Sequence, residues 1–250
     1  MLLLLDIGNT HTHLGLANDR CVTRQANIPT DAWFGNDAAG QVEAFIGRAQ
    51  PTGAALCSVV PKATPRVRQA IQRQWRLDCL ELTPKTLVGV GIDYPAPGSI
   101  GPDRLANAVA ARHHFGAPSL VVDFGTAVTF DVVDRAGNYV GGIIAPGLAS
   151  MTDYLHDKTA LLPKIKIREV NEVIGKNTRQ AMLIGAVHGY RGLIRELIIE
   201  LKRELNCRRL PVVATGGYAK LIATKLPGIT AVDPLLTLEG LRLVWQQRNA

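Results

Sequence analysis

Two short stretches of the sequence combine a carboxylate, a glycine and a threonine in the same order. The first is Asp6-Ile7-Gly8-Asn9-Thr10 and the second is Asp123-Phe124-Gly125-Thr126. Glycine lets the backbone turn sharply, so that backbone N–H groups and the threonine hydroxyl of each turn can donate hydrogen bonds to phosphate oxygens. The aspartate can hold a cation that offsets the phosphate charge. Each stretch therefore predicts a phosphate-binding turn.

Apolar runs over residues 2–5 and 120–122 precede these turns, and residues typical of strands follow them over 13–16 and 128–133. Such runs predict a strand on each side of each turn. A single Asp-x-Gly turn is more often a purely structural feature of a hairpin. Because the whole arrangement occurs twice, the sequence indicates two related halves that face one nucleotide.

A third polar group, Gly101-Pro102-Asp103-Arg104, stands at the start of a predicted helix and follows a loop that carries Tyr94. An aspartate at this place commonly caps the helix. It is equally placed to accept a proton from a substrate alcohol, with Arg104 binding a substrate carboxylate through two hydrogen bonds. Both interpretations of Asp103 stay open on local grounds.

Glycine pairs and histidines give weaker signals. Thr215-Gly216-Gly217 after an apolar strand lets a flat base approach the backbone, although such a pair commonly forms only a turn. Residues 141–147 either line the same cleft or form a tight connection. His11 and His13 flank Thr12 next to the first turn, where they either contact phosphate or pack on the surface.

The composition excludes several classes of protein. The 250 residues are 47% hydrophobic and carry a net charge of +7, which suits nucleic-acid binding, attraction of anionic metabolites or solubility. Scattered basic residues and only 5% aromatic residues favour the last two, so nucleic acid is not an expected partner. The four cysteines form no Cys-x-x-Cys pair, which removes the usual zinc and dithiol motifs.

The apolar start of the chain is not expected to be a signal peptide, because Asp6 interrupts it and no basic segment precedes it. No run reaches the roughly 18 apolar residues of a membrane span. We therefore expect no membrane partner and a cytoplasmic location.

Hydrophobic periodicity predicts alternating strands and helices, and hence an α/β fold with mixed sheets. A boundary near residue 117 divides the chain into halves 1–117 and 118–250. Besides the two hairpins, we expect strands over 54–60, 78–82, 139–144 and 210–214, a turn over 145–148, and helices over 38–49, 64–75, 102–114 and 238–247 and from about 149 and 178.

Taken together, these motifs resemble the type III pantothenate kinases in order and spacing over nearly the whole chain. The resemblance implies the fold of the acetate and sugar kinase, heat-shock chaperone and actin superfamily: two ribonuclease-H-like halves with mixed sheets around a nucleotide cleft. The motifs that carry it are Asp6-x-Gly8-Asn9-Thr10, Gly101-x-Asp103-Arg104-x-x-Asn107, Asp123-x-Gly125-Thr126-Ala127-x-Thr129-x-Asp131, Gly141-Gly142-x-Ile144-x-Pro146-Gly147, Thr159-Ala160-x-Leu162-Pro163, Asn177-Thr178 and Thr215-Gly216-Gly217.

The resemblance implies ATP-dependent phosphorylation of pantothenate to 4′-phosphopantothenate, the first step of coenzyme A biosynthesis, by a homodimer. It makes Asp103 the general base, places magnesium near Asp6, and gives Asp123 a monovalent cation, potassium or ammonium. Thr178 would serve the site of the neighbouring subunit. The implied ATP contacts are Asp6, Ile7, Gly8, Asn9, Thr10, His11, Thr12, His13 and Thr126, and the implied pantothenate contacts are Tyr94, Gly101, Pro102, Asp103, Arg104 and Thr178.

Two other functions stay open beside this one. In the first alternative, the chain is a catalytically inactive accessory or regulatory relative of the family. In the second, it is a kinase of the same superfamily that acts on another small alcohol. Retention of Asp6, Asp103, Arg104 and Asp123 together argues against the first alternative. Tyr94 and the Gly101 to Arg104 segment are the features that favour pantothenate over another alcohol as the substrate.

Overall fold

The first β-sheet is built mainly from the N-terminal third of the chain. Its strands lie in the order β3-β2-β1-β4-β5, in which β1, β2 and β3 are antiparallel neighbours and β4 and β5 run parallel to β1. The central strands β1 and β4 are buried on both faces, which explains their nearly continuous apolar sequences. The bounds are β1 (Leu2–Ile7), β2 (His11–Ala17), β3 (Val22–Pro29), β4 (Gly53–Ser58) and β5 (Cys79–Glu81).

The second sheet repeats this topology strand for strand. Its order is β11-β10-β7-β8-β9-β6, so that β7, β8, β9, β10 and β11 correspond to β1, β2, β3, β4 and β5, and β6 pairs in parallel with β9. The predicted α/β fold with two related mixed sheets is confirmed. The bounds are β6 (Gly91–Ile92), β7 (Ser119–Phe124), β8 (Ala127–Val133), β9 (Asn138–Pro146), β10 (Val212–Thr215) and β11 (Ala231–Val232).

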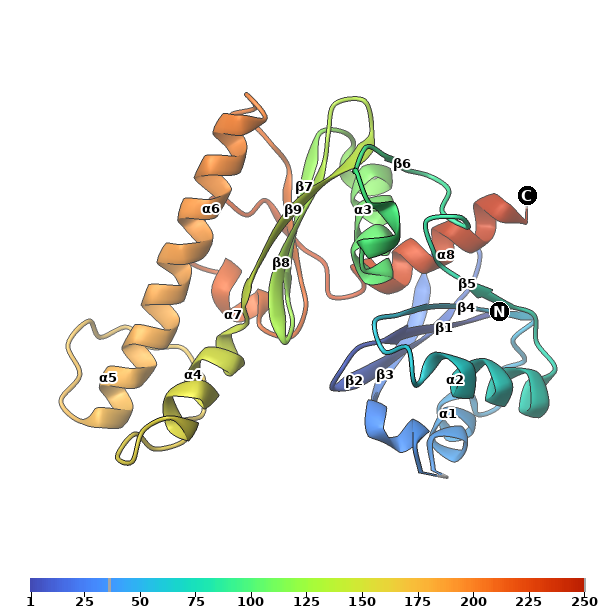
Figure 1. Cartoon of the computed structure of the whole chain (residues 1–250), viewed down its shortest axis with the longest axis horizontal. Helices are drawn as coiled ribbons and strands as arrows, with labels where there is room; N and C mark the ends of the chain where they lie inside the picture. The colour runs from blue at the N-terminus through green and yellow to red at the C-terminus, as the bar shows by residue number, and fades with distance from the viewer. Residues whose placement is uncertain (36, 250) are drawn as a thin grey trace.

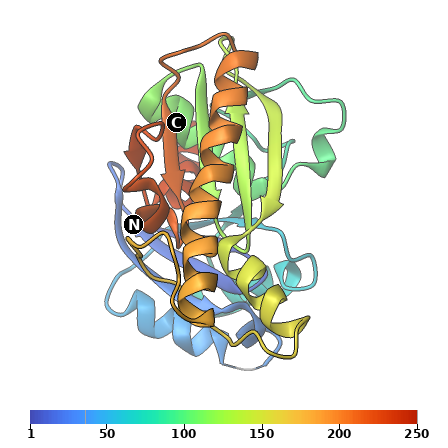
Figure 2. The same cartoon turned by 90° about the vertical axis from the view of Figure 1, so that its left-hand side faces the viewer.

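The computed structural model describes residues 1–35 and 37–249, and its helices cover both sheets (Figure 1). Helices α1 and α2 lie on the outer face of the first sheet, and α6 runs along the outer face of the second, as Figure 2 shows. The bounds are α1 (Ala38–Ile46), α2 (Thr64–Ala70), α3 (Pro102–Phe115), α4 (Leu148–Asp157), α5 (Thr178–Ile184), α6 (Tyr190–Glu204), α7 (Ala219–Ala223) and α8 (Leu236–Arg248), with π-helical turns over Ile71–Trp75 and Gly185–Gly189 and 3₁₀ turns over Thr30–Trp33 and Pro97–Ser99.

Four elements, the strands β3, β6 and β11 and the short helix α7, were not expected from the sequence. The strand β3 lies at the sheet edge and exposes most of its polar side chains, so it lacks the apolar alternation that predicts a strand. The expected turn over 145–148 is wrong in its first half, because β9 continues to Pro146 in register with Ala127 of β8. In both cases, pairing with the preceding strand rather than the pattern of the strand's own side chains decides the structure.

Helices α3 and α8 form a layer between the two sheets (Figure 1). Helix α3 packs on β7 and β8, whereas α8, at the end of the chain, packs on β1 and β4 of the first sheet. Their buried residues form one apolar core with residues of both sheets. The division of the chain at residue 117 stays a prediction, and the return of α8 ties the two expected halves together.

The crossing of these helices is unusually close at Gly240. A Cβ atom there would lie 2.0 Å from the carbonyl oxygen of Ala106 in α3. The absence of a side chain therefore lets the two backbones touch.

Among residues 1–35 and 37–249, no helix is long and apolar enough to cross a membrane.

Gly240→Ala is expected to destabilise the protein, because the new methyl group would force α8 away from α3. Overpacking of this kind costs about 1–3 kcal/mol. Gly192→Ala in α6 is the matched control, since beyond its chain neighbours and the backbone of its own helix nothing lies within 4 Å of the added methyl group, and alanine in a helix is favoured by about 0.5–1 kcal/mol. Urea denaturation measures both, and equal stabilities of the two variants would contradict the close crossing.

Candidate active site

The two predicted phosphate-binding turns meet in the folded chain. The first connects β1 to β2 and is closed by a hydrogen bond from the Gly8 N–H to the His11 carbonyl oxygen over 3.0 Å. The second connects β7 to β8. The hydroxyl oxygens of Thr10 and Thr126 lie 3.4 Å apart, and both residues are exposed. Their hydroxyl groups are thus available to one ligand that bridges the two sheets.

Carboxylates from three elements surround this meeting point and repel one another. The pKa of Asp6 is raised to about 7, mainly by desolvation, with the charges of Asp103 and Asp123 adding to the rise and His13 opposing it. Desolvation also raises the pKa of Asp123 to about 6, and Asp103 contributes to that shift. Such a concentration of negative charge favours a bound cation.

These carboxylates fit cations that are shared with phosphate oxygens. Within residues 1–35 and 37–249, no three acidic, histidine or cysteine side chains gather closely enough to hold a metal ion by themselves. Magnesium is usually bound by one or two carboxylates together with water and substrate phosphates. A single carboxylate at each turn, Asp6 and Asp123, is therefore a suitable protein contribution for such a site.

Asp103 lies in the first turn of α3, and the N-cap residue is Gly101. Its Oδ1 accepts the backbone N–H of Arg104 over 2.8 Å, while no hydrogen bond from the described residues reaches Oδ2. Burial raises its pKa, against the hydrogen bond and charge of Arg104. Asp103 is therefore not the N-cap residue of α3; its Oδ1 accepts one N–H of the first turn, and its Oδ2 is free to accept a proton.

Arg104 is held in place by a buried carboxylate that the sequence analysis gave no role. Its Nε donates to Asp131 Oδ1 over 2.5 Å, and its Nη2 donates to the Phe130 carbonyl oxygen over 3.1 Å. The guanidinium group also lies over the Tyr139 ring, 5.7 Å from the centroid. One edge of the guanidinium is thus committed to the protein. A polar residue at an inward position of an otherwise apolar strand was the available signal for Asp131.

The glycine pair in β9 lies beside Arg104 and Tyr94. A Cβ on Gly141 would lie 3.3 Å from the Tyr94 ring, and one on Gly142 would lie 1.6 Å from the Phe130 carbonyl oxygen and 3.1 Å from Arg104 Nη2. At the far end of the segment, the Gly147 N–H donates to the Thr126 carbonyl oxygen over 3.2 Å. The 141–147 segment therefore lines the site, which decides between its two interpretations.

Gly216 brings the third glycine segment to the same place. Its φ of +87° is in the left-handed region, and a Cβ there would lie 2.5 Å from Asp123 Oδ1. Because β10 pairs with β7 so that Thr215 stands opposite Asp123, the turn that follows Thr215 must pass this carboxylate. The backbone approaches closely because Gly216 has no side chain.

Two further side chains hold the site carboxylates, and the sequence analysis assigned a role to neither of them. The Cys57 thiol in β4 donates to Asp6 Oδ1 over 3.3 Å, in agreement with the register that pairs these residues. Asn107 in α3 donates to Asp123 Oδ2 over 3.1 Å. Asn107 stands one helical turn after Asp103 on the same face of α3, and it belongs to the Gly101-x-Asp103-Arg104-x-x-Asn107 motif, which named it without a role.

Thr178 is the predicted site residue that does not join the others within one chain. It begins α5 and is exposed, and Figure 1 shows α5 on the opposite side of the second sheet from α3. The remaining predicted residues lie in or beside the two turns and at the start of α3, except Tyr94, which lies in the loop after β6. His13 lies beside Asp6, where its ring also bonds Asn27 over 2.8 Å, and His11 is exposed.

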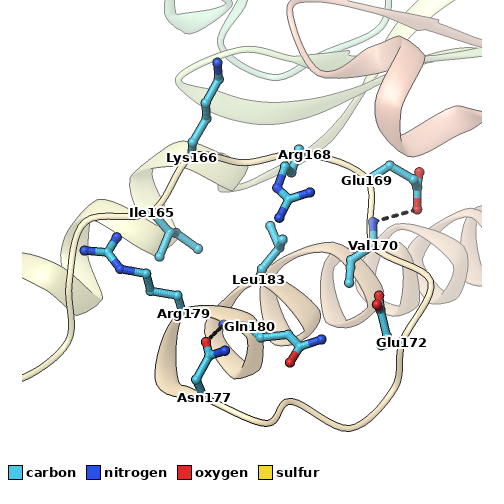
Figure 3. Close-up of a pocket in the computed structure, with 10 residues that line it drawn as sticks. All are labelled: Ile165, Lys166, Arg168, Glu169, Val170, Glu172, Asn177, Arg179, Gln180 and Leu183. Carbon is cyan, nitrogen blue, oxygen red and sulfur yellow. Dashed lines mark hydrogen bonds between the residues drawn. The ribbon is translucent and has the colours of Figure 1, made fainter.

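A cavity of about 510 Å³ lies between α5 and the segment before it (Figure 3). Its lining includes the basic side chains Lys166, Arg168 and Arg179, and the figure shows Glu169 and Glu172 at its opposite end. None of the predicted site residues lines this cavity, although Thr178 is adjacent in sequence to two residues that do. Another cavity, of about 860 Å³, lies beside α2 and β5.

Asp6→Asn is expected to stabilise the protein at high pH. Since the folded-state pKa of about 7 lies above the usual 3.8, the folded wild type binds this proton more tightly than the unfolded chain does. Its stability is then full below about pH 4 and falls as the pH rises through 7. Asparagine does not titrate, so the variant should exceed the wild type by about 1–4 kcal/mol at pH 8, with a smaller difference at pH 4.

Urea denaturation at both pH values, with a chelator and without nucleotide, measures this difference. Asp78→Asn, at an exposed aspartate, is the control. A difference between Asp6→Asn and the wild type that does not change with pH would contradict the raised pKa of Asp6.

Comparison with known proteins agrees with this geometry. A model of the type III pantothenate kinase family matches residues 2–200. A type III pantothenate kinase from Akkermansia muciniphila is 46% identical over 242 residues, which cover 96% of each chain. Another from Methylacidiphilum infernorum is 42% identical and covers 97% of this chain and 87% of the relative.

Solved structures share the fold at low sequence identity. A protein from Campylobacter jejuni, described as a Baf family transcriptional activator, has a TM-score of 0.62 at 20% identity over 99% of this chain and 98% of its own. A ROK hexokinase from Thermus thermophilus has a TM-score of 0.52 at 12% identity over 99% of both chains. The fold is thus that of two-lobed sugar kinases, and from the family match and the full-length relatives, this chain belongs to the type III pantothenate kinase family.

Proposed function

We propose that the chain transfers the γ-phosphoryl group of ATP to the primary hydroxyl group of pantothenate, giving 4′-phosphopantothenate and ADP at the first step of coenzyme A biosynthesis. The observation that carries this proposal is the meeting of the two Asp-Gly-Thr turns beside Asp103. Membership in the family supports the choice of substrate.

The residues of the first turn, Asp6 to His13, together with Thr126 are assigned to the ATP phosphates. Backbone N–H groups and the two facing threonine hydroxyls supply donors to phosphate oxygens. Asp6 and Asp123 would hold magnesium and a monovalent cation, potassium or ammonium, respectively. Magnesium, when bound, neutralises charge on the transferred group. The monovalent cation requirement and the cytoplasmic location stay predictions.

Asp103 is assigned as the general base. As the pantothenate hydroxyl oxygen bonds to the γ-phosphorus, the bond from that phosphorus to the ADP oxygen breaks, and Asp103 Oδ2 takes the hydroxyl proton. The raised pKa makes this carboxylate a stronger base than an exposed aspartate. Arg104, oriented by Asp131, and Tyr94 are assigned to pantothenate, with Gly101 and Pro102 beside them.

A homodimer is proposed because exposed apolar side chains lie on α4 and in the segment between α4 and α5, and because α5, which Thr178 begins, lies on the opposite side of the second sheet from α3 (Figure 1). We define the α4 patch as Met151, Tyr154, Leu155, Leu161, Val173 and Ile174, all of which are exposed, from 37% for Met151 to 90% for Leu161. An exposed apolar patch of this kind is typical of a protein interface. A second copy that covers this patch would carry its own Thr178 toward a neighbouring active site.

ADP release with ATP, magnesium and pantothenate tests the activity. We expect pantothenate-dependent turnover that is faster in potassium than in sodium. Asp103→Asn should lose about 10²- to 10⁴-fold in kcat, the usual contribution of a general base, and should keep the wild-type circular dichroism. Asp78→Asn controls for the loss of an aspartate charge elsewhere. Near-wild-type kcat in Asp103→Asn would overturn the base assignment, and no turnover by the folded wild type would overturn the function.

Mixed dimers test whether the site is shared between subunits. Thr178→Arg and Asp103→Asn should each be nearly inactive alone. After unfolding and refolding together, half of the dimers carry one copy of each variant, and one of their two sites has both native residues. Activity should therefore return to about a quarter of the wild-type value. No recovery, with mixed dimers shown by mass spectrometry, would contradict a shared site.

A further inference from the structure

A chain of two hydrogen bonds connects Asp123 to the last helix of the protein. Asn107 in α3 donates from Nδ2 to Asp123 Oδ2 over 3.1 Å, and the Thr237 hydroxyl in α8 donates to Asn107 Oδ1 over 2.8 Å. Asn107 is only 1% exposed. The mechanism proposed above uses neither Asn107 nor Thr237.

The two bonds require one orientation of the Asn107 amide. An ionised carboxylate only accepts hydrogen bonds, so the NH₂ group of Asn107 must face Asp123 and its carbonyl oxygen must face away. Thr237 supplies the donor for that carbonyl oxygen. Without the hydroxyl, a buried acceptor would lose its partner, which is costly in a protein interior. Each bond therefore supports the other.

This arrangement decides which oxygen of Asp123 is available. Oδ2 is occupied by Asn107, and among the described residues no hydrogen bond reaches Oδ1. A Cβ placed on Gly216 would lie 2.5 Å from Oδ1, and one placed on Gly125 would lie 3.9 Å from it. Oδ1 therefore lies between the turn that carries Thr126 and the turn after β10, on the side where the nucleotide is expected.

The close helix crossing explains why Thr237 reaches Asn107. Gly240 touches Ala106, the residue before Asn107, and Thr237 lies three residues before Gly240 on the same face of α8. On α3, Asp103 lies four residues before Asn107 on the same face. One helix thus presents both the proposed base and the side chain that holds Asp123.

We propose that Asn107 and Thr237 are positioning residues, which orient the Asp123 carboxylate so that its Oδ1 binds the monovalent cation beside the nucleotide. The inference rests on the proposed function, since it takes Asp123 as the cation-binding residue. It goes beyond that function in assigning control of the cation to a helix that contacts the first sheet.

Thr237→Val tests the inference, because it removes the hydroxyl with almost no change of shape, and Thr237→Ser restores the hydroxyl. Thr23→Val is the matched control: it removes a threonine bond of 2.9 Å to the Leu16 carbonyl oxygen in a distant strand pair. For each protein, calorimetry measures ATP binding with magnesium as potassium is titrated at constant ionic strength. Steady-state ADP release then gives kcat and KM at each potassium concentration.

Thr237→Val should raise the half-saturating potassium concentration about three- to tenfold, as expected from the loss of one buried hydrogen bond. Its kcat should recover at saturating potassium. Thr237→Ser and Thr23→Val should titrate like the wild type. A merely structural role for Thr237 would lower the melting temperature without moving the potassium titration.

Three results would overturn the inference: a wild-type titration for Thr237→Val, a Thr237→Ser variant as impaired as Thr237→Val, or wild-type ATP binding that does not respond to potassium. The binding titration does not need pantothenate. If the wild type binds ATP with a potassium response but does not phosphorylate pantothenate, the proposed function fails while the positioning role is still decided by the binding data.

Discussion

The contact of α3 with α8 at Gly240 is the constraint on which the rest of the structure depends. Each sheet buries one face under its own outer helices, and its other face is covered by helices that contact both sheets. The pair α3 and α8 supplies that cover for both sheets, and it does so in one layer because Gly240 lets the backbones meet. Asp103 and Asn107 both lie on α3. The packing of α3 against α8 therefore sets their position relative to the β1–β2 turn and the β7–β8 turn.

The site gathers negative charge that the folded protein alone does not neutralise. Desolvation and mutual repulsion raise the pKa values of Asp6 and Asp123, and Asp103 adds to both shifts. Such an arrangement costs stability in the absence of ligand and is typical of sites that bind cations and phosphates. Desolvation also raises the pKa of Asp131, to about 7, but Asp131 differs from these residues in forming an ion pair with Arg104, which opposes that rise.

The two halves of the chain have the same topology but use it differently. At corresponding strand ends, Asp6 accepts a hydrogen bond from the thiol of Cys57 in the neighbouring strand, whereas Asp123 accepts one from Asn107 in a helix. The neighbour of Asp123 in the sheet is followed by Gly216, whose backbone comes close to the carboxylate. The duplicated turn therefore provides two carboxylates in different surroundings, which suits two different cations.

The sequence by itself determined the elements whose signals are local. Apolar runs before Asp6 and Asp123 marked the central strands, glycine and threonine marked the turns, and the repeated order indicated two related sheets. Only the tertiary structure decided which side chains hold these carboxylates. Cys57, Asn107 and Thr237 lie 51, 16 and 130 residues from their partners, so no local pattern reveals their bonds. The edge strand β3 was missed for a different reason: most of its side chains are exposed and polar, and its pairing with the preceding strand β2 makes it a strand.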